Sequence, residues 1–372
     1  MFSHLELLQY SRHILLPEIG YKGQIALKNA SVLVVGAGGL GCPVLQYLTA
    51  AGVGRIGIID FDKVDRSNLQ RQILYSVEDI GKQKADTAVK KLSLQNPNVH
   101  FDTHNTKLTS LNALETLKDY EVIIDCSDNF PTRYLVNDAC LMLNKPFVFG
   151  ALYKFEGQVS VFNYNNGPTY RCLLPDYPDA SEVLNCSEIG VMGVMAGIIG
   201  SLQACEAIKI IAGVGDVLSG KLLIIDALKI NFNIIHIEKN NKNKKLTKFP
   251  DYDELCNVKK QKESVRLITA INLQKKINDK SDLVIIDIRE PYEFKDVKIP
   301  GSTNIPMLQI EKNIHRIPRN KPVCIVCDYG TKSEQVIRHL AKSYGYSNLI
   351  NLYKGIVEWM NVNNSNTNKK TK

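Results

Sequence analysis

The stretch SVLVVGAGGLGCPVLQYLTAAGVGRIGIIDFD, residues 31–62, decides the fold of the first half of this chain. Val32–Val35 are consecutive apolar residues, mostly β-branched, which is typical of a strand buried in a parallel sheet. Glycines with the spacing G-x-G-x-x-G follow, and residues 40–51 are predicted to form a helix. A second apolar strand, Ile56–Ile59, ends at Asp60. The order of strand, glycines, helix, strand and acid predicts a nucleotide site.

Each glycine of this motif has a physical role. Gly36, Gly38 and Gly41 allow a tight turn, a close approach of the backbone to a phosphate, and close packing of the helix on the strand. The free N–H groups at the start of the helix favour an anion there. Asp60 stands where a carboxylate accepts hydrogen bonds from a ribose. An NAD-dependent dehydrogenase and an ATP-using enzyme share all of these features, so other residues must separate them.

Composition sets the class of protein. The chain has 372 residues, of which 44% are hydrophobic and 23% charged, enough for two globular domains. The formal charge of +8 is concentrated in residues 239–262 and in the tail, which favours a solvated linker over a nucleic-acid groove, with an acidic protein partner as the alternative. Nine cysteines without a signal peptide indicate a cytoplasmic protein. The apolar stretch at 189–204 is too short and too soon followed by charges for a membrane span, and a buried helix is expected.

Apolar periodicity divides the chain into two α/β units. Strands and helices alternate over residues 31–150, which predicts a mostly parallel sheet, and residues 151–163 predict a hairpin around Gly157. Apolar periodicity is lost after residue 240 and returns in a second, smaller α/β unit. The predicted boundaries are a first domain over 1–240, a linker over 241–263, a second domain over 264–362 and a disordered tail over 363–372.

Basic residues after the second strand indicate which nucleotide binds. Asn68, Arg71 and Lys84 all follow that strand, and ligands of open α/β sheets bind at the carboxyl ends of the strands. A dehydrogenase has no use for such a cluster. Attack on an α-phosphate needs one, because negative charge grows on the phosphate oxygens. The alternative from spacing alone is a set of unrelated surface cations.

Four strings make this comparison specific: GAGGLGC, SNLQRQ, GKQKA and CSDNFPTR, which begin at residues 36, 67, 81 and 126. They resemble the MoeB/ThiF family, ubiquitin-activating-type enzymes that adenylate the C-terminal glycine of a small sulfur-carrier protein. The resemblance covers residues 8–237 and implies a Rossmann-like adenylation domain that uses ATP and Mg2+. It implies nucleotide contacts by Gly36, Gly38, Gly39, Gly41, Asp60, Ser67, Asn68, Leu69, Gln70, Arg71, Lys84, Asp128 and Asn129.

Two residues have further implied roles. Asp128 would hold Mg2+, and a carboxylate that follows a strand at the glycine-loop edge is independently a reasonable Mg2+ ligand. Arg12, in YSRHILL, matches an arginine that family members insert into the neighbouring subunit's site. The resemblance therefore implies a homodimer.

The cysteines depart in part from the family pattern. Members commonly hold a structural zinc with two C-x-x-C pairs, but here only Cys172 of TYRC and Cys256 of DELC remain. Two thiolates fall short of the usual four ligands, so we expect no structural zinc. Cys186 matches a cysteine that some relatives use covalently in sulfur transfer, and a packing role is the alternative.

The second unit has a cysteine suited to sulfur chemistry. Cys327 ends the strand PVCIVC and begins the loop CDYGTKS ahead of a predicted helix, where backbone N–H groups stabilise a thiolate or persulfide. With DIREPYEF and IPGSTNIP, from residues 287 and 299, this unit resembles a rhodanese. Relatives often have a basic residue after this cysteine, whereas Asp328 stands here and Lys332 is the loop's cation. We therefore expect a protein persulfide, as on a cysteine desulfurase, to be a better donor than thiosulfate.

The sequence thus predicts an adenylyltransferase and sulfurtransferase. ATP and the carrier's terminal carboxylate would give an acyl-adenylate, and a persulfide on Cys327 would convert it to a thiocarboxylate for molybdopterin or thiamine biosynthesis. The expected catalytic residues are Arg12, Arg71, Lys84, Asp128, Cys186 and Cys327. An NAD-dependent oxidoreductase and a non-catalytic carrier-binding scaffold are the alternatives. Neither a nucleic acid nor a membrane is expected as a partner.

Overall fold

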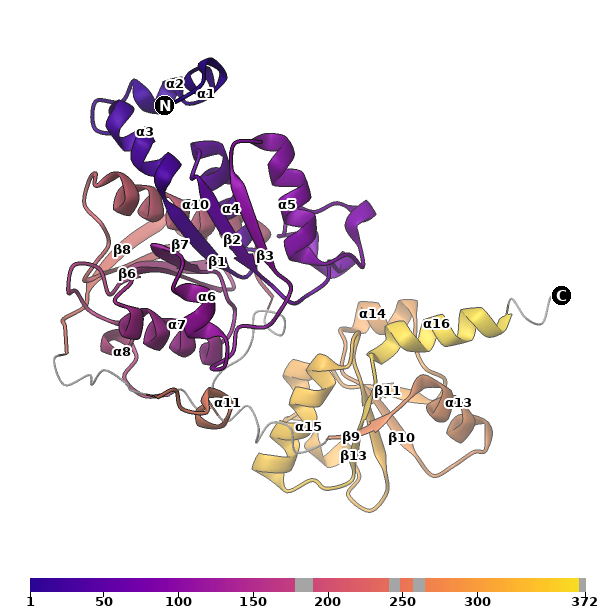
Figure 1. The fold of residues 1–372 in the computed structure, drawn as a ribbon. Coiled ribbons are helices and arrows are strands. Elements are labelled where there is room, and N and C mark those ends of the chain that lie inside the picture. Colours follow the sequence, from indigo (N-terminus) through magenta and orange to yellow (C-terminus); the bar gives the residue numbers. More distant parts are fainter. Residues whose placement is uncertain (178–189, 241–247, 257–264, 368–372) are drawn as a thin grey trace. The chain divides into compact units, whose positions relative to one another are not determined.

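The computed structural model describes residues 1–177, 190–240, 248–256 and 265–367. The chain divides into two compact units, Met1–Val258 and Lys259–Lys372. Figure 1 shows a mixed α/β architecture in each unit.

The first unit is built on one eight-stranded sheet with the order β3-β2-β1-β4-β5-β6-β7-β8. Its strands are β1 (Ser31–Val35), β2 (Arg55–Ile59), β3 (His100–His104), β4 (Val122–Asp125), β5 (Phe147–Tyr153), β6 (Glu156–Phe162), β7 (Lys221–Asp226) and β8 (Asn231–His236). The first five in this order pair in parallel, and β6 to β8 add antiparallel strands at one side. The predicted Rossmann-like, mostly parallel sheet is confirmed.

Helices cover both faces of this sheet (Figure 1). One face is covered by α4 (Gly41–Ala51), α5 (Lys84–Gln95) and α10 (Gly193–Ala212). The other is covered by α6 (Ala113–Leu117), α7 (Phe130–Leu143) and α8 (Tyr170–Leu173). Further helices are α1 (His4–Gln9), α2 (Ser11–Ile14), α3 (Gly20–Asn29) and α11 (Tyr252–Leu255). The central strands are apolar because they are buried on both faces: Val32, Leu33 and Val34 are inaccessible to solvent.

The apolar helix α10 packs inside this unit. By length and composition alone it could cross a membrane. It contacts α3, α4, β5 and β6, however, and 44% of its most apolar 18-residue stretch is buried inside the structure. Two of its glycines fit against neighbouring chain: a Cβ on Gly193 would lie 2.2 Å from Gln70 O, and one on Gly200 would lie 2.5 Å from Leu40 O. Gly197 has nothing within 4 Å. The expected helix is therefore present, and two of its three glycines, Gly193 and Gly200, lie directly against neighbouring chain.

The predicted hairpin forms with a different turn. Its strands are β5 and β6, and the turn falls at Lys154 and Phe155, so Gly157 lies inside β6. A Cβ on Gly157 would lie 2.3 Å from Ile199 Cγ1 of α10. Gly157 is required by the packing of the helix on the strand, and we had interpreted it as a turn residue.

The second unit has a five-stranded parallel sheet with the order β11-β10-β12-β13-β9. The strands are β9 (Arg266–Ile268), β10 (Val284–Asp287), β11 (Ser302–Asn304), β12 (Val323–Val326) and β13 (Leu349–Leu352). The helices are α13 (Ala270–Asn278), α14 (Pro291–Asp296), α15 (Thr331–Tyr344) and α16 (Gly355–Thr367). Buried apolar clusters lie on both faces of the sheet. α16 extends into residues 363–367, which we had expected to be disordered.

Candidate functional site

The carboxyl ends of three adjacent strands meet at the glycine loop. Val35, the last residue of β1, pairs with Ile59 of β2 on one side and with Asp125 of β4 on the other. The chain proceeds from β1 to β2 in one direction and later returns to place β4 on the opposite side. This reversal creates a crevice at the carboxyl ends of β1 and β4, where open α/β sheets bind their ligands.

The glycine loop is held in a conformation that excludes larger residues. Gly36 has a φ of 98°, and a Cβ there would lie 2.9 Å from Cys126 O. A Cβ on Gly41 would lie 2.0 Å from Gly36 O, so helix and turn approach each other more closely than an alanine permits. The carboxylate of Asp60 accepts hydrogen bonds from Ala37 N and Asp62 N, both at 2.8 Å. Burial raises the pKa of Asp60, and the charge of Lys84 opposes that rise.

The two predicted cations lie at this loop. Lys84, the first residue of α5, is 5% exposed, and its Nζ lies 3.1 Å from Asp62 Oδ2. Tyr75 Oη donates to Ala37 O at 2.8 Å and approaches Lys84 O at 3.2 Å, which ties α5 to the glycine loop. The Arg71 side chain runs beside Gly39: a Cβ on that glycine would lie 3.6 Å from Arg71 Cγ.

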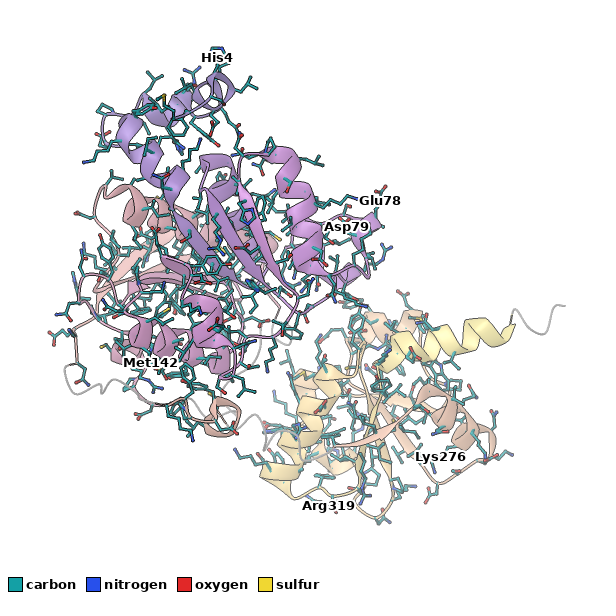
Figure 2. All side chains as sticks on the ribbon, in the orientation of Figure 1. His4, Glu78, Asp79, Met142, Lys276 and Arg319 are labelled. Atoms are coloured by element: carbon teal, nitrogen blue, oxygen red, sulfur yellow. The ribbon has the colours of Figure 1, made fainter. Side chains whose placement is uncertain are left out.

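The segment between β2 and α5 is braced at several points. Its 3-10 turn, Arg66–Asn68, is capped by Asp65, which accepts from Ser67 N at 2.8 Å, while Asn68 Oδ1 accepts from Asp65 N at 3.3 Å. Arg71 Nη1 donates to Ser67 O at 3.0 Å. Glu78 and Asp79 lie farther along the segment (Figure 2), and Asp79 forms an ion pair of 2.5 Å with Lys91 of α5. Of the other predicted contact residues, Leu69 packs on the apolar core and Gln70 lies against Gly193.

Asp128 follows β4, the neighbour of β1 on the side opposite to β2. Asp128 is exposed, while Asn129 caps α7 by accepting from Thr132 N at 3.0 Å. Asp125 is fully buried, its Oδ1 accepts from Ser127 N at 2.9 Å, and burial raises its pKa. The structure thus separates an exposed carboxylate at position 128 from a structural one at position 125.

Arg12 lies apart from this group of residues in its own chain. Arg12 is exposed on α2, whose neighbour Tyr10 packs on Gly52 just after the last turn of α4. That end of α4 is opposite to its start at Gly41, so Arg12 lies away from the glycine loop of its own chain. Cys186 lies outside the described residues.

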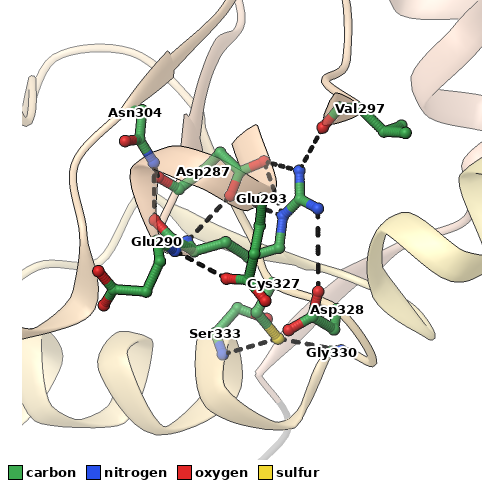
Figure 3. Close-up of polar contacts among 10 residues, drawn as sticks. Asp287, Glu290, Glu293, Val297, Asn304, Cys327, Asp328, Gly330 and Ser333 are labelled. Atoms are coloured by element: carbon green, nitrogen blue, oxygen red, sulfur yellow. Dashed lines mark hydrogen bonds and ion pairs between the residues drawn. The ribbon is translucent and has the colours of Figure 1, made fainter. Parts of the chain in front are cut away.

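Cys327 occupies a loop between β12 and α15 that surrounds its sulfur. The residue is 1% exposed, and its Sγ accepts from Gly330 N at 3.1 Å and Ser333 N at 3.3 Å (Figure 3). The Ser333 hydroxyl lies 3.2 Å from the same sulfur. Gly330 has a φ of 86°, which closes the loop so that these N–H groups point inward. N–H groups at the start of a helix stabilise negative charge on sulfur.

An ion-pair chain borders this loop. The Arg289 guanidinium donates to Asp287 at 2.7 Å and to Val297 O at 2.6 Å, and its Nη1 lies 3.8 Å from Asp328 Oδ1 (Figure 3). Burial raises the pKa of Asp328, and the charge of Glu293 raises it further. Arg289 is thus already engaged by carboxylates beside the loop.

The two cysteines left from the family's metal pairs lie in one apolar cluster. Cys172 Sγ accepts from Thr169 N at 3.4 Å and from Asn240 N at 3.3 Å, and Cys256 is 4% exposed. Nearby, Asp138 accepts from Arg171 at 2.7 Å and from Tyr252 Oη at 2.6 Å, which joins α11 to α7 and α8. Within the described residues, three or more His, Cys, Asp or Glu side chains nowhere gather as a metal site.

Comparison with known proteins assigns both units. Residues 10–247 match the ThiF family, and residues 269–362 match the rhodanese-like domain. The chain belongs to the ThiF family. It is 40% identical over 368 residues to the probable adenylyltransferase/sulfurtransferase MoeZ of Mycobacterium tuberculosis, an alignment that covers 96% of this chain and 93% of that protein. It is 39% identical over 382 residues to the adenylyltransferase and sulfurtransferase MOCS3 of Drosophila grimshawi, covering 96% and 85%.

Solved structures share the fold of the first unit. Escherichia coli MccB with ATP aligns with a TM-score of 0.56 and 22% identity, over 63% of this chain and 73% of that one. MccB with MccA-N7isoASN aligns with a TM-score of 0.58 at the same identity, over 65% and 74%. The ThiF-family chain is therefore an enzyme of the adenylyltransferase/sulfurtransferase class, and the dehydrogenase and scaffold alternatives are set aside.

Sequence reasoning missed several residues of the two sites. Asp62, which pairs with Lys84, and Tyr75, which ties α5 to the loop, were not singled out. Asp62 could have been singled out, because it is a second acid that follows Asp60 by two residues. Ser333 stands in the quoted loop CDYGTKS and could have been singled out there, whereas Asn351 gave no signal, because its partners Ser333 and Gly330 come from another part of the chain.

Proposed function

We propose that the enzyme adenylates the C-terminal glycine of a ubiquitin-like sulfur carrier and then converts it to a thiocarboxylate with sulfur from Cys327. The observation that carries this proposal is the pairing, in one chain, of a glycine loop flanked by Lys84 and Arg71 with a cysteine whose sulfur accepts two backbone N–H groups. The carrier serves molybdopterin or thiamine biosynthesis in this proposal, and a cytoplasmic location stays a prediction.

The first reaction takes place in the crevice at β1 and β4. The carrier carboxylate attacks the α-phosphate of ATP, a P–O bond to the leaving pyrophosphate breaks, and an acyl-adenylate forms. Lys84 and Arg71 stabilise the charge that develops on the phosphate oxygens. The N–H groups at the start of α4 bind phosphate, and the neighbouring backbone approaches it closely because glycines line the turn.

Asp128 fits a Mg2+ ion bound together with ATP. Mg2+ in such sites keeps water and phosphate ligands and takes one or two carboxylates from the protein. Asp128 supplies one exposed carboxylate at the crevice, while Asp125 is buried and engaged by Ser127 N. When bound, the ion would neutralise charge on the phosphates, with Asp128 as its protein ligand. Asn129, at the start of α7, would lie against the nucleotide.

The second reaction uses a persulfide on Cys327. Its terminal sulfur attacks the acyl carbonyl, AMP leaves, and an acyl disulfide joins the carrier to Cys327. A thiol then attacks the Cys327 sulfur of this disulfide, forms a new disulfide with it, and releases the carrier as a thiocarboxylate. Cys186 is the candidate for that thiol.

The charges at the Cys327 loop support a protein persulfide as the donor. Thiosulfate is a dianion, and it would approach a loop whose residue 328 is a carboxylate and whose neighbouring Arg289 is paired with Asp287. A persulfide on a cysteine desulfurase carries less charge at the transferred sulfur. This arrangement favours such a donor over thiosulfate.

The proposal includes a homodimer in which Arg12 completes the partner's site. Arg12 is exposed and lies beside the far end of α4 from the glycine loop. The helices around it expose apolar side chains: Leu5 is 74%, Leu8 60% and Leu15 69% exposed in the single chain. Apolar patches of this kind mark interaction surfaces.

Replacing Cys327 by serine tests the division of labour. Cys327→Ser keeps nearly the same volume but cannot carry a persulfide. We expect this variant to form acyl-adenylate at the wild-type rate and to make no carrier thiocarboxylate from a protein-persulfide donor. Mass spectrometry of the carrier detects the replacement of one oxygen by sulfur.

Cys324→Ser is the matched control, because Cys324 is buried in β12 and burial raises the pKa of its thiol to about 12. A reductant control excludes oxidation, which adds nearly the same mass as the exchange. Thiocarboxylate formed at the wild-type rate by Cys327→Ser would contradict the proposal and direct attention to Cys186.

A further inference from the structure

Ser333 joins the reactive sulfur to a buried amide. Its hydroxyl lies 3.2 Å from Cys327 Sγ on one side and 2.6 Å from Asn351 Oδ1 on the other. Ser333 is inaccessible to solvent and Asn351 is 3% exposed, so water does not compete for these bonds. Ser333 is the last residue of the loop CDYGTKS but was given no role there, and Asn351 comes from the next strand, β13.

The orientation of the Asn351 amide follows from its second bond. Asn351 Nδ2 donates to Gly330 O at 2.8 Å, so its Oδ1 faces Ser333. A carbonyl oxygen only accepts, and the bond of 2.6 Å therefore uses the single hydroxyl proton of Ser333. In this arrangement Ser333 Oγ can only accept from Cys327, and the thiol S–H of Cys327 donates to it.

Loss of the Cys327 proton reverses this preference. The Cys327 thiolate has no proton to donate, and Ser333 Oγ then faces it with a lone pair. Rotation about the Cβ–Oγ bond turns the Ser333 hydroxyl toward the sulfur and breaks its bond to Asn351. Hydrogen bonds to charged groups are stronger than neutral ones, which supplies the driving force.

We propose that the Ser333 hydroxyl is a two-position donor that Asn351 holds in the thiol position and that Cys327 captures when its sulfur becomes an anion. Asn351 is then a positioning residue for sulfur transfer: it competes with Cys327 Sγ for one proton and so keeps the Cys327 thiolate nucleophilic toward the donor persulfide. The proton stays on Ser333 Oγ throughout. In the step that loads sulfur onto Cys327, the Cys327 thiolate attacks the outer sulfur of a donor persulfide. This attack forms the Cys327 persulfide and releases the donor thiolate.

The test measures the pH midpoint of Cys327 alkylation by iodoacetamide in the full-length protein, by mass spectrometry of the peptide that contains it. Ser333→Ala removes the donor, and we expect the alkylation rate at pH 7 to fall about tenfold and the midpoint to rise. Ser333→Thr keeps a hydroxyl and restores the wild-type midpoint. Asn351→Ala frees the hydroxyl for the sulfur, and we expect the midpoint to fall and persulfide transfer to slow.

A double variant separates this proposal from a loosened loop. In the Ser333→Ala background, Asn351→Ala should leave the midpoint unchanged, because the proton for which it competes is gone. A further shift in the double variant, or shifts of the same sign in the two single variants, would overturn the proposal. The charged groups that face Asp328 in this loop, namely Glu293, Arg289, Lys332 and Asp287, are the same in all variants.

Asn348→Ala is the matched control, because the Asn348 amide, like that of Asn351, donates to backbone carbonyls of the same unit, here Pro318 O and Lys321 O. Asn348→Ala should leave the pH midpoint of Cys327 alkylation unchanged. A midpoint that shifted in Asn348→Ala as it does in Asn351→Ala would contradict the proposal. If Asn351→Ala does not fold, Asn351→Leu keeps the same arrangement of side-chain heavy atoms and also lacks the acceptor.

Discussion

At the scale of single residues, the adenylation site depends on a buried lysine. A buried ammonium group is costly unless it is paired, and Lys84 meets that condition through Asp62, which is itself half exposed. The pair is therefore open to the crevice on the Asp62 side. A nucleotide phosphate that approaches from that side finds a cation whose position is already set by Tyr75 and the start of α5.

Replacing Lys84 tests this arrangement. We expect Lys84→Ala to lower carrier-dependent ATP–pyrophosphate exchange by a factor of about 100 to 1,000, because it removes one preorganised charge from the transition state. Lys90→Ala is the control, since Lys90 is exposed on the same helix. Circular dichroism checks that both variants are folded. Exchange near the wild-type rate in folded Lys84→Ala would refute the role of this lysine.

The sequence located residues whose role is local and missed those whose role depends on tertiary contact. Asp60 and Cys327 each end a strand beside a turn, so their neighbours along the chain already indicate their surroundings. Tyr75 and Asn351 act on groups many positions away, Ala37 and Ser333. No periodicity or spacing in the sequence encodes those contacts.

At the scale of elements, α10 shows how glycines set helix packing. Gly200 lies where a Cβ would be 2.5 Å from both Leu40 O and Pro43 Cγ of the glycine-loop helix region, whereas Gly197 has open space around it. At Gly200, the space for a Cβ is occupied by backbone that cannot move without shifting the start of α4. Gly197 has no such constraint, although both glycines lie on the same helix.

These glycines should therefore respond to alanine with opposite signs. Gly200→Ala overpacks the contact, and we expect a loss of about 1–3 kcal/mol in the free energy of unfolding. Gly197→Ala gains helix propensity and should stabilise by up to about 1 kcal/mol. Far-UV circular dichroism in urea measures both at one protein concentration. Fluorescence of Trp359, the sole tryptophan, reports on the second unit and should not change.

Equal destabilisation by the two substitutions would show that α10 tolerates no added methyl group anywhere, which contradicts the open space at Gly197.

Burial also explains which elements the sequence could predict. The apolar strands and α10 were predicted because runs of consecutive apolar residues indicate buried elements. The short β9 and β11 were not, since each has three residues and only Ile268 among them is deeply buried.

At the scale of the whole molecule, both unit types and their order were predictable because each unit has several motifs, each confined to a short continuous stretch of sequence. Oligomeric state is different, since only one motif, YSRHILL with Arg12, indicates a partner. The position of Arg12 is the informative feature: Tyr10, two residues before it, packs on Gly52 at the end of α4. α4 has 11 residues and is about 16 Å long, which is farther than an arginine side chain reaches toward the glycine loop at its other end.

Subunit mixing tests whether Arg12 acts in the partner's site. In a dimer of Arg12→Ala and Lys84→Ala subunits, one site combines the intact Lys84 of the first subunit with the intact Arg12 of the second, and the other site lacks both. Half of the dimers in an equal, fully exchanged mixture are heterodimers, so we expect about a quarter of the wild-type ATP–pyrophosphate exchange. Measured alone, Arg12→Ala and Lys84→Ala should each show only a residual rate of ATP–pyrophosphate exchange.

The Arg12→Ala/Lys84→Ala double variant gives the complementary measurement. Mixed equally with wild type, it inactivates both sites of every heterodimer if Arg12 acts across the interface, and about a quarter of the wild-type exchange per total subunit is left. If Arg12 acts within its own chain, the wild-type subunit of each heterodimer keeps its site and about half is left. Mass spectrometry of intact dimers confirms that subunits have exchanged. Half activity here, together with no recovery in the first mixture, would place Arg12 in the site of its own chain.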